Sequence, residues 1–190
     1  MNLKQFAEIQ TGYLFRTKVP EEPSGNVTVV QMKDCSAING IDWESCVKTQ
    51  LAQVRDHEWL REGDILIPSR GNNYQAVYVD SNIADRKAVA SPHFFVIRTI
   101  SPQILPKYLD WWLNLQANQK YLNQNVEGTM TKSLRRPVLQ ALPLKIPSLS
   151  KQEMIIAMAE TVKQERLTAL RLIENNEQLM NAIAQHLDEE

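Results

Sequence analysis

The feature that most constrains this sequence is its C-terminal stretch, which runs from Lys151 to Leu187 without a glycine or a proline. These two residues are the strongest helix breakers, so their absence predicts one uninterrupted helix. Ser150, followed three residues later by Glu153, is typical of a capping box and predicts where the helix begins. At ~1.5 Å per residue such a helix is about 55 Å long. A small domain cannot cover that length, so the helix is expected to pack against another helix.

Apolar and small residues recur along this stretch at alternating steps of three and four, which predicts a coiled-coil seam. The seam residues are Ala159, Val162, Arg166, Ala169, Ile173, Asn176, Met180, Ile183 and Leu187, broadened by Leu172 and Leu179. Arg166 and Asn176 interrupt the apolar seam, and a single amphipathic helix lying on its own domain explains these interruptions less well than helix pairing does.

Two arrangements of a helix pair remain open, and the antiparallel one is favoured. A two-fold axis at Ile173 places every polar seam residue opposite a small or flexible one. The facing pairs are Val162 with Ile183, Arg166 with Met180, and Ala169 with Asn176. A parallel pair would instead place Asn176 opposite its own copy, which is also a stable arrangement. Only the antiparallel pair puts the two globular parts at opposite ends.

The residues before the helix predict a mixed α/β body, so the expected fold class is α+β: a globular domain over 1–147 and a helical region over 148–190. β-branched and apolar runs bounded by turn residues predict the strands, and Pro106 opens a helical pattern. The expected strands are Val27–Met32, Asp64–Ile67, Gln75–Val79 and His93–Thr99, and the expected helix covers 105–125.

Charge and composition narrow the class of protein without identifying it. Residues 1–150 hold 17 basic and 14 acidic side chains and residues 151–190 hold 4 and 8, so the net charge of −1 averages a mildly basic body and an acidic arm. This balance permits nucleic-acid binding but does not establish it. No apolar run is long enough for a membrane span, and the N-terminus does not resemble a signal peptide. Cys35 and Cys46 are typical of reduced thiols, so a cytoplasmic location is expected.

The sequence lacks the motifs of the enzyme classes considered. It contains no Gly-rich phosphate loop, no Asn-Pro-Pro-aromatic or Asp-Pro-Pro-aromatic tetrapeptide, and no Glu-x-Lys nuclease pattern. His57, between Asp56 and Glu58, could recruit a metal, but a solvated charged turn is the better interpretation. The chain is therefore predicted not to be an enzyme and to need no cofactor or metal.

Two segments carry the residue types that contact DNA. Arg, Asn and Gln read base edges through paired hydrogen bonds, whereas Lys, Arg and hydroxyl side chains hold phosphates. The first segment contributes Arg70, Asn72, Asn73, Tyr74 and Gln75, and the second contributes Thr129, Lys132, Arg135 and Arg136. The second lies within residues 128–147, which include no acidic residue. An ordinary hairpin turn and a solvated basic face explain the two sets about equally well. Weaker candidates are Arg16, Lys18, Arg86 and Lys87.

Several stretches together resemble a type I restriction–modification specificity subunit. They are GDILIPSRG with QAVYV after it, SPHFFVIR, and above all the junction GTMTKSLRRPVLQALPLKIPSLSKQEMI that leads into the long helix. FAEIQTGYLFR and VTVVQMKDCSAINGIDW also resemble the start of such a domain. The resemblance covers essentially the whole chain and implies one target-recognition domain followed by one conserved helical region.

A full subunit of that family has two recognition domains and two helical regions, and this chain has one of each. The resemblance therefore implies a half-subunit that pairs with a second copy, recognises double-stranded DNA at a bipartite site with inverted half-sites, and joins methylation and restriction subunits. Two other functions remain open. One is a recognition subunit for a fused methyltransferase–nuclease of the type IIB kind, and the other is a coiled-coil interaction module that does not bind DNA.

Overall fold

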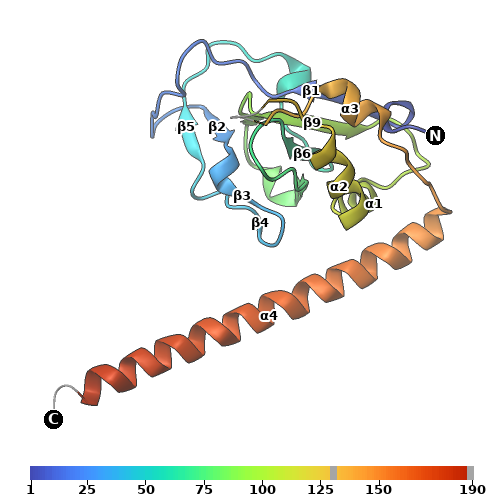
Figure 1. Cartoon of the computed structure of the whole chain (residues 1–190). Coiled ribbons are helices and arrows are strands. Elements are labelled where there is room, and N and C mark those ends of the chain that lie inside the picture. Colours follow the sequence, from blue (N-terminus) through green and yellow to red (C-terminus); the bar gives the residue numbers. More distant parts are fainter. Residues whose placement is uncertain (129–131, 188–190) are drawn as a thin grey trace.

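The computed structural model describes residues 1–128 and 132–187, with side chains up to residue 185. Strands and short helices form a body from which one long helix projects (Figure 1). The strands are β1 (Ala7–Thr11), β2 (Val27–Val30), β3 (Cys35–Ser36), β4 (Gly40–Ile41), β5 (Val47–Thr49), β6 (Ile65–Pro68), β7 (Val77–Tyr78), β8 (Ala88–Ala90) and β9 (Phe94–Thr99). The α-helices are α1 (Pro106–Leu113), α2 (Gln116–Gln124), α3 (Arg136–Ala141) and α4 (Leu149–Leu187). The 3-10 helices are η1 (Leu3–Gln5), η2 (Met32–Asp34), η3 (Asp56–Glu58) and η4 (Ser81–Ile83).

The main sheet is antiparallel, in the order β1-β9-β6-β7. Its central strand β9 is buried on both faces, because successive side chains of a strand point to opposite sides. Phe95 and Ile97 enter one apolar core, together with residues of α1, α2 and α3. Phe94 and Val96 enter a second core. The sheet therefore holds the helices on one side and the rest of the body on the other.

A smaller sheet, in the order β5-β2-β8, completes the body, and β3 and β4 form a separate short hairpin. Within the smaller sheet β2 is antiparallel to β5 and parallel to β8. Val27, Val29 and Val89 form a third apolar cluster. In Figure 1 the β3–β4 hairpin extends from the body in the direction of α4.

The predicted fold class is confirmed, because sheets and short helices precede one long helix. The predicted hairpin is also present, since Ile65 of β6 pairs with Tyr78 of β7. Pro68 is the last residue of β6, as expected of a residue that cannot donate a backbone hydrogen bond. The predicted strand starting at Val27 ends at Val30.

The single helix predicted over 105–125 is wrong, because the chain breaks between α1 and α2 at Asn114–Leu115. The cause is the side chain of Asn114, which binds the backbone of Ala76 in two places. Its Oδ1 accepts from the Ala76 N–H at 2.8 Å, and its Nδ2 donates to the Ala76 carbonyl at 3.0 Å. Leu115 then takes an extended conformation before α2. Helical periodicity continues across the break, so the apolar pattern gave no sign of it.

The long helix is confirmed, but its start differs from the prediction. The carbonyl of Ser148 accepts from the Gln152 N–H at 3.0 Å, so the helical hydrogen bonding begins at Ser148. The predicted cap, Ser150, lies two residues further along the chain. Beyond its first turns most of the described side chains of α4 are exposed. None of the helices in the described part of the chain is long and apolar enough to cross a membrane.

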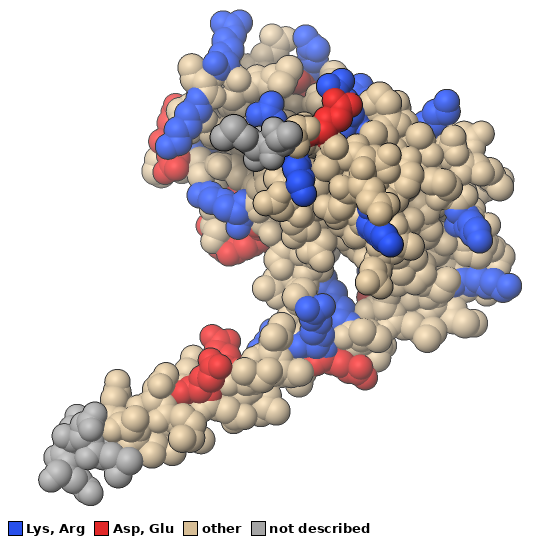
Figure 2. All heavy atoms as spheres, viewed as in Figure 1, with Lys and Arg blue, Asp and Glu red and all other residues tan. Residues whose placement is uncertain are grey.

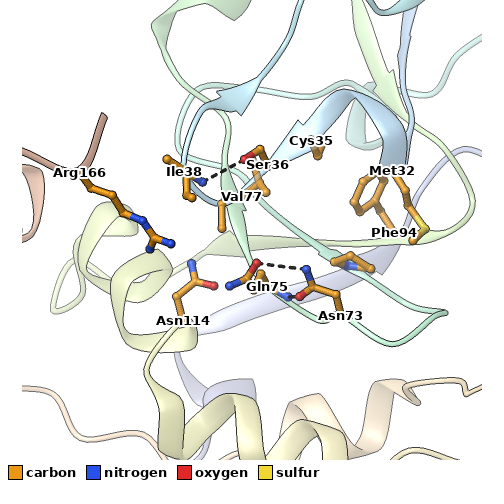
Figure 3. A pocket seen from close by; sticks show the side chains of 12 residues that line it. Met32, Cys35, Ser36, Ile38, Asn73, Gln75, Val77, Phe94, Asn114 and Arg166 are labelled. Carbon is orange, nitrogen blue, oxygen red and sulfur yellow. Dashed lines mark hydrogen bonds between the residues drawn. The ribbon is translucent and has the colours of Figure 1, made fainter. Parts of the chain in front are cut away.

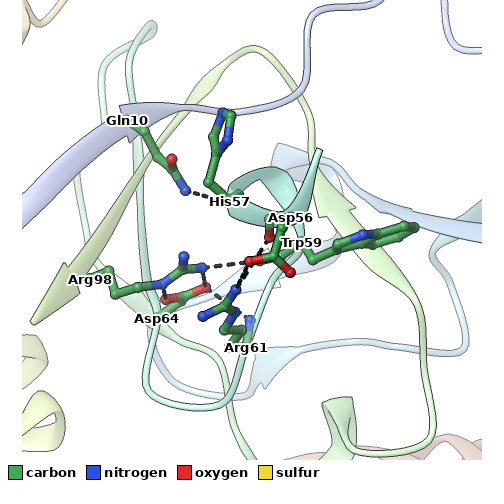
Figure 4. A network of polar contacts seen from close by, with 7 residues as sticks. All are labelled: Gln10, Asp56, His57, Trp59, Arg61, Asp64 and Arg98. Atoms are coloured by element: carbon green, nitrogen blue, oxygen red, sulfur yellow. Dashed lines mark hydrogen bonds and ion pairs between the residues drawn. The ribbon is translucent and has the colours of Figure 1, made fainter. Parts of the chain in front are cut away.

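An ion pair inside the body fixes β6 to β9 (Figure 4). The guanidinium of Arg98 donates to both carboxylate oxygens of Asp64 at 2.7 Å and to the carbonyl of Trp59 at 3.0 Å. Asp64 is buried, and its hydrogen bonds compensate for the loss of water. Asp56, beside His57, pairs with Arg61 at 2.7 Å. Among the described residues no cluster could hold a metal ion, including the one around His57.

Candidate nucleic-acid interface

The structure brings the two predicted DNA-contacting segments together. The N–H of Leu134 donates to the carbonyl of Ser69 at 2.9 Å, and the N–H of Gly71 donates to the carbonyl of Lys132 at 3.0 Å. Between these bonds Arg70 and Ser133 form an antiparallel bridge. Segments about sixty residues apart in sequence therefore lie side by side on one surface, which local sequence patterns do not predict.

The second segment is held from its other side as well. Glu127 and Ser133 exchange two backbone hydrogen bonds, of 3.0 and 2.8 Å. Ser69 continues from β6, and its N–H donates to the carbonyl of His93 just before β9. The backbone of residues 132–134 is thus held by the segment that continues from β6 and by Glu127. These bonds fix the positions of the backbone atoms from which the side chains of 132–134 project.

Glycine is needed at position 71 for its backbone conformation. Gly71 has φ +106°, a region that other residues rarely adopt. A Cβ atom there would meet only the side-chain tip of Met32 at 3.7 Å, so space is not the constraint.

The turn that contains Asn72 is stabilised from below by Tyr74. Tyr74 is 0% exposed, and its hydroxyl donates to the carbonyl of Gly71 at 2.7 Å. The carbonyl of Tyr74 accepts from Nε2 of Gln119 at 3.0 Å. The burial of Tyr74 contradicts the prediction that it contacts DNA, because its ring belongs to the core.

The other predicted residues differ in how free their polar groups are. Arg70, Asn72, Lys132 and Arg136 are exposed, and so are Asn73, Gln75 and Arg135. Thr129 lies outside the described residues. The side chains of Asn73 and Gln75 bind each other at 3.1 Å, and Oδ1 of Asn73 also accepts from the Gln75 N–H. Arg135 forms an ion pair with Glu127. These three residues would have to exchange a local bond for a contact with DNA.

In Figure 2 Lys and Arg side chains are spread over the visible face of the body, and acidic side chains lie beside some of them. The weaker candidates for DNA contact differ in whether their side chains are already bound to other residues. Arg16 and Lys18 are exposed. Arg86 is held by Glu44 at 2.9 Å and lies over the ring of Trp43, which indicates a structural role.

One buried amide fixes the start of α4 to the body. Gln152 is 0% exposed, and its Oε1 accepts from the Leu105 N–H at 2.9 Å. Its Nε2 donates to the carbonyls of Gln103 and Pro147, at 2.7 and 2.9 Å. Lys107 of α1 adds an ion pair to Glu160, about two turns further along α4 than Gln152. The start of α4 therefore has a defined direction relative to the body.

In the part of the chain that the structure describes, most residues of the seam predicted on α4 are exposed. Val162, Ile173 and Met180 are 62%, 54% and 63% exposed. Ala169, Asn176 and Ile183 are exposed as well, and the side chain of Leu187 is outside the described part.

A cleft of about 650 Å³ separates the first half of α4 from the body. Its walls include Tyr78 and Trp111 on the body and Val162 and Lys163 on α4. A second hollow adjoins it and shares Ile38, Asn114 and Arg166 with it, and Figure 3 shows Arg166 reaching from α4 toward Asn114.

Asp110 of α1 also lines this cleft. Burial raises the pKa of its carboxyl to about 7, although the positive charge of Lys163 opposes the shift. The pKa values of the Cys35 and Cys46 thiols are raised to about 12 by burial and by the charge of Asp34, so both thiols are uncharged near neutral pH.

A family model described as the type I restriction modification DNA specificity domain matches residues 1–179. The chain belongs to the type I restriction–modification specificity family. Specificity subunits of these systems are non-catalytic DNA-recognition subunits, in agreement with the prediction that the chain is not an enzyme. No curated protein matches the sequence.

Solved structures share the fold of this specificity-family chain. The HsdS subunit from Thermoanaerobacter tengcongensis matches with a TM-score of 0.66 at 17% identity, over 91% of this chain and 43% of that one. The S subunit from M. genitalium matches with 0.57 at 13% identity, over 90% and 40%. A chain from a structure described as showing complex assembly and conformational transition of the type I R-M system matches with 0.64 at 15% identity, over 89% and 38%. The chain thus spans about two fifths of the length of each.

Three residues that hold this arrangement were not singled out from the sequence. Glu127 neutralises Arg135, Gln152 fixes the helix, and Asn114 separates α1 from α2. Only Gln152 had a sequence signal, since it stands in the junction that carries the family resemblance. The other two depend on contacts between segments far apart in sequence.

Proposed function

We propose that this chain reads one half of a bipartite site in double-stranded DNA and does so with the surface formed by residues 69–73 and 132–136. The observation that carries the proposal is the backbone pairing of these two segments, which brings exposed Arg70 and Lys132 to neighbouring positions. Exposed Arg136 follows two residues after the paired segment, at the start of α3. Family membership supports it independently.

Within this surface, the residues divide by the contact that each can make. Arg70 lies on the turn next to Gly71, where the backbone can approach DNA closely, and its guanidinium can donate two bonds to a guanine. Lys132 and Arg136 fit phosphate contacts, which set register and contribute the salt-dependent part of the affinity. Asn72 is a second candidate for reading a base, since asparagine pairs with adenine.

The pairing of two copies through α4 supplies the second half-site. An antiparallel pair with its axis at Ile173 would place the bodies at opposite ends of the helices. Two-fold symmetry then requires the half-sites to be inverted copies, and helix length sets their spacing. The exposed apolar side chains of α4 support this part of the proposal.

The partners that fit this function are a methylation subunit and a restriction subunit of a type I system, acting on DNA in the cytoplasm. One structure with the same fold is described as showing assembly of such a system. A fused methyltransferase–nuclease of the type IIB kind would differ in the partner that co-purifies with the chain.

The test is a selection on randomised duplex DNA near physiological salt, with the protein alone and with its methylation subunit. Recovery of two inverted half-sites at one fixed spacing is expected. A single half-site would retain the DNA-reading surface and overturn the pairing. No enrichment in either experiment would overturn DNA recognition and favour the interaction-module alternative.

Two variants then separate reading of bases from phosphate contact. Arg70→Ala is expected to lose about 1–3 kcal/mol of binding and to relax preference at one base pair in each half-site. Arg136→Ala is expected to weaken all sequences alike and to lower the salt slope by about one per copy. A variant whose affinity and selected sequence equal those of the wild type would remove that residue from the surface.

A further inference from the structure

We infer that the loop after β1, residues 12–18, is a further DNA-contacting segment, in which Leu14 reads the methyl group of a thymine. This inference rests on the proposed function and deepens it, because it adds an apolar contact to a surface that otherwise offers charged and polar side chains. Arg16 and Lys18, on the same loop, hold phosphates near that thymine.

The first argument is the place where this loop leaves the sheet. β1 and β6 lie on either side of β9 and are both antiparallel to it, so they run in the same direction (Figure 1). Pro68, the last residue of β6, pairs with Phe94, and the N–H of Gly12 donates to the carbonyl of Phe94 at 2.9 Å. Neighbouring strands are ~4.8 Å apart, so Gly12 and Pro68 are separated by about 10 Å. The loop and the turn that carries Arg70 therefore begin at the same edge of the sheet.

The second argument is that the backbone of the loop is fixed where it begins. Gly12 is buried, and a Cβ atom on it would lie 2.0 Å from the carbonyl oxygen of Ser91, so only glycine allows this close approach. The N–H of Tyr13 donates to the carbonyl of Ala90 at 2.8 Å. The rings of Tyr13 and Phe15 are 4.9 Å apart, edge to face, and both pack against the third apolar cluster. These contacts hold the residue between the two rings in place.

The third argument is the exposure of that residue, Leu14. Its side chain is 73% exposed, although both of its neighbours in sequence are part-buried. A single exposed leucine is ordinary on a protein surface. This one differs because an anchored backbone presents it at the edge from which the Arg70 turn emerges. Leucine has no hydrogen-bonding side-chain group, so the feature of a base edge that it can recognise is the C5-methyl group of thymine in the major groove.

The fourth argument is the charge around Leu14. Arg16 and Lys18 are exposed, and neither forms an ion pair with another residue in the part of the chain that the structure describes. Residues 12–18 include no acidic residue. The two cations therefore fit phosphate contacts next to the base that Leu14 reads.

The geometry also limits where the thymine lies. The loop and the Arg70 turn begin about 10 Å apart, and successive base pairs rise ~3.4 Å along the duplex. The thymine is therefore expected within about four base pairs of the pair that Arg70 reads.

The test is replacement of thymine by uracil, which lacks only the C5-methyl group. The duplex recovered by the selection is made with one thymine of one half-site replaced at a time, on either strand, and binding of the full chain is measured by fluorescence anisotropy. For the wild type, one replacement within the expected distance should weaken binding about fourfold, the effect of one buried methyl group. Leu14→Ala is expected to bind the thymine and uracil duplexes equally.

Ile100→Ala is the matched control. Ile100 is 62% exposed and follows the last residue of β9, so at ~3.3 Å per residue it lies about 20 Å from the edge that carries the loop. This variant removes a side chain of the same size from the far end of the sheet and should keep the wild-type preference for thymine. Thermal unfolding should be the same for the wild type and both variants, since both side chains are exposed.

The outcomes separate this inference from the proposed function. A wild-type chain that binds the selected duplex and every uracil duplex equally would overturn the inference and leave the proposed function intact. A thymine preference that Leu14→Ala retains would do the same, and so would a recovered half-site without an A·T pair. A chain for which the selection recovers no sequence, with or without its methylation subunit, would overturn the proposed function and this inference with it.

Discussion

Two isoleucines show how differently the two regions of this chain treat apolar surface. Ile97 in β9 is 0% exposed and lies in the core between sheet and helices, whereas Ile173 in α4 is 54% exposed. The body also pairs its polar groups internally, as in the bidentate contact of Arg98 with Asp64. Burying an isoleucine side chain contributes ~1.5–3 kcal/mol, so each half-exposed seam residue leaves about 1 kcal/mol unrealised.

The difference is that the body buries most of its large apolar side chains within its own cores, whereas α4 leaves most of its apolar side chains exposed. The connection between the two regions resembles the body, because its key side chain is buried and hydrogen-bonded. Gln152 is the only α4 residue in the described part of the chain that is fully buried, and all of its bonds go to body or junction residues. Four predictions test this contrast, starting with the largest effect.

Placing a charge at the centre of the seam should abolish self-association. In Ile173→Asp, two carboxylates would meet at the two-fold axis in place of two apolar side chains, so we expect the dimer dissociation constant to rise more than 100-fold. Thermal unfolding of the body should not change. Sedimentation equilibrium measures the first effect and circular dichroism the second.

Asn175→Asp is the matched control for that variant. Position 175 is exposed on the opposite side of α4 from the seam, so this variant adds the same negative charge without entering the pair. Association of Ile173→Asp at the wild-type level would contradict the assignment of the seam.

Removing the amide of Gln152 should destabilise the body and the start of α4 together. Gln152→Leu leaves the Leu105 N–H and the Gln103 carbonyl without their buried partner, and each unsatisfied group costs ~1–3 kcal/mol, so a loss of about 3 kcal/mol is expected. Urea unfolding measures it. Gln164→Leu, an exposed change on the same helix, should stay within about 0.5 kcal/mol. Equal effects of the two variants would show that the junction does not fix α4.

Ionisation of Asp110 should make stability depend on pH. Its folded pKa, about 7, lies above its ordinary value of 3.8, so the folded state holds the proton more tightly. The free energy of unfolding should therefore fall as pH rises from about 4 to about 7 and level off above that. Because Asp110 is only part-buried, we expect about 2 kcal/mol, roughly half of what a shift of this size gives at ~1.4 kcal/mol per pH unit.

Asp110→Asn removes this dependence. The variant should be more stable than the wild type at pH 8, and the two should converge near pH 4. Urea unfolding at a series of pH values is the measurement, and a pH-independent difference between the two proteins would contradict the assignment to Asp110.

The smallest expected effect comes from releasing Arg135. The Glu127–Arg135 pair lies on the surface and contributes under ~1 kcal/mol to stability. Glu127→Gln should leave stability unchanged and tighten DNA binding about threefold at low salt, because it removes a negative charge and frees a cation for phosphate. Glu44→Gln, which breaks the pair with Arg86 instead, is the control. Fluorescence anisotropy against salt concentration should show a steeper slope for Glu127→Gln only.

Local patterns predicted the elements that local forces determine. The absence of Gly and Pro predicted α4, and β-branched and apolar runs bounded by turn residues predicted β2, β6 and β9, each to within a few residues at its ends. The break at Asn114 was missed because it depends on Ala76, which is 38 residues away. Tyr74 was misassigned for a similar reason, since its burial depends on the helices that pack over the turn.

In the candidate site, too, the sequence predicted the residue types but not the contacts between distant segments. Residue type alone selected Arg70, Lys132 and Arg136 among the candidates, and the structure leaves all three exposed, with the segments of Arg70 and Lys132 paired through their backbones. Their proximity could not be predicted, because a strand bridge between Arg70 and Ser133 joins segments separated by sixty-three positions. The ion pairing of Arg135 could not be predicted either, because its partner Glu127 lies just outside the basic segment.

The most direct test of the central claim, that α4 pairs antiparallel with a second copy, is disulfide formation between seam positions. Val162→Cys and Ile183→Cys are made separately in a chain whose Cys35 and Cys46 are replaced by alanine, and the two proteins are mixed under mild oxidation. In the antiparallel pair positions 162 and 183 face each other, whereas the two copies of position 162 lie about 33 Å apart along the axis. The account predicts covalent dimers in the mixture and none from either protein alone. Covalent dimers from Val162→Cys alone would show a parallel pair and contradict the account.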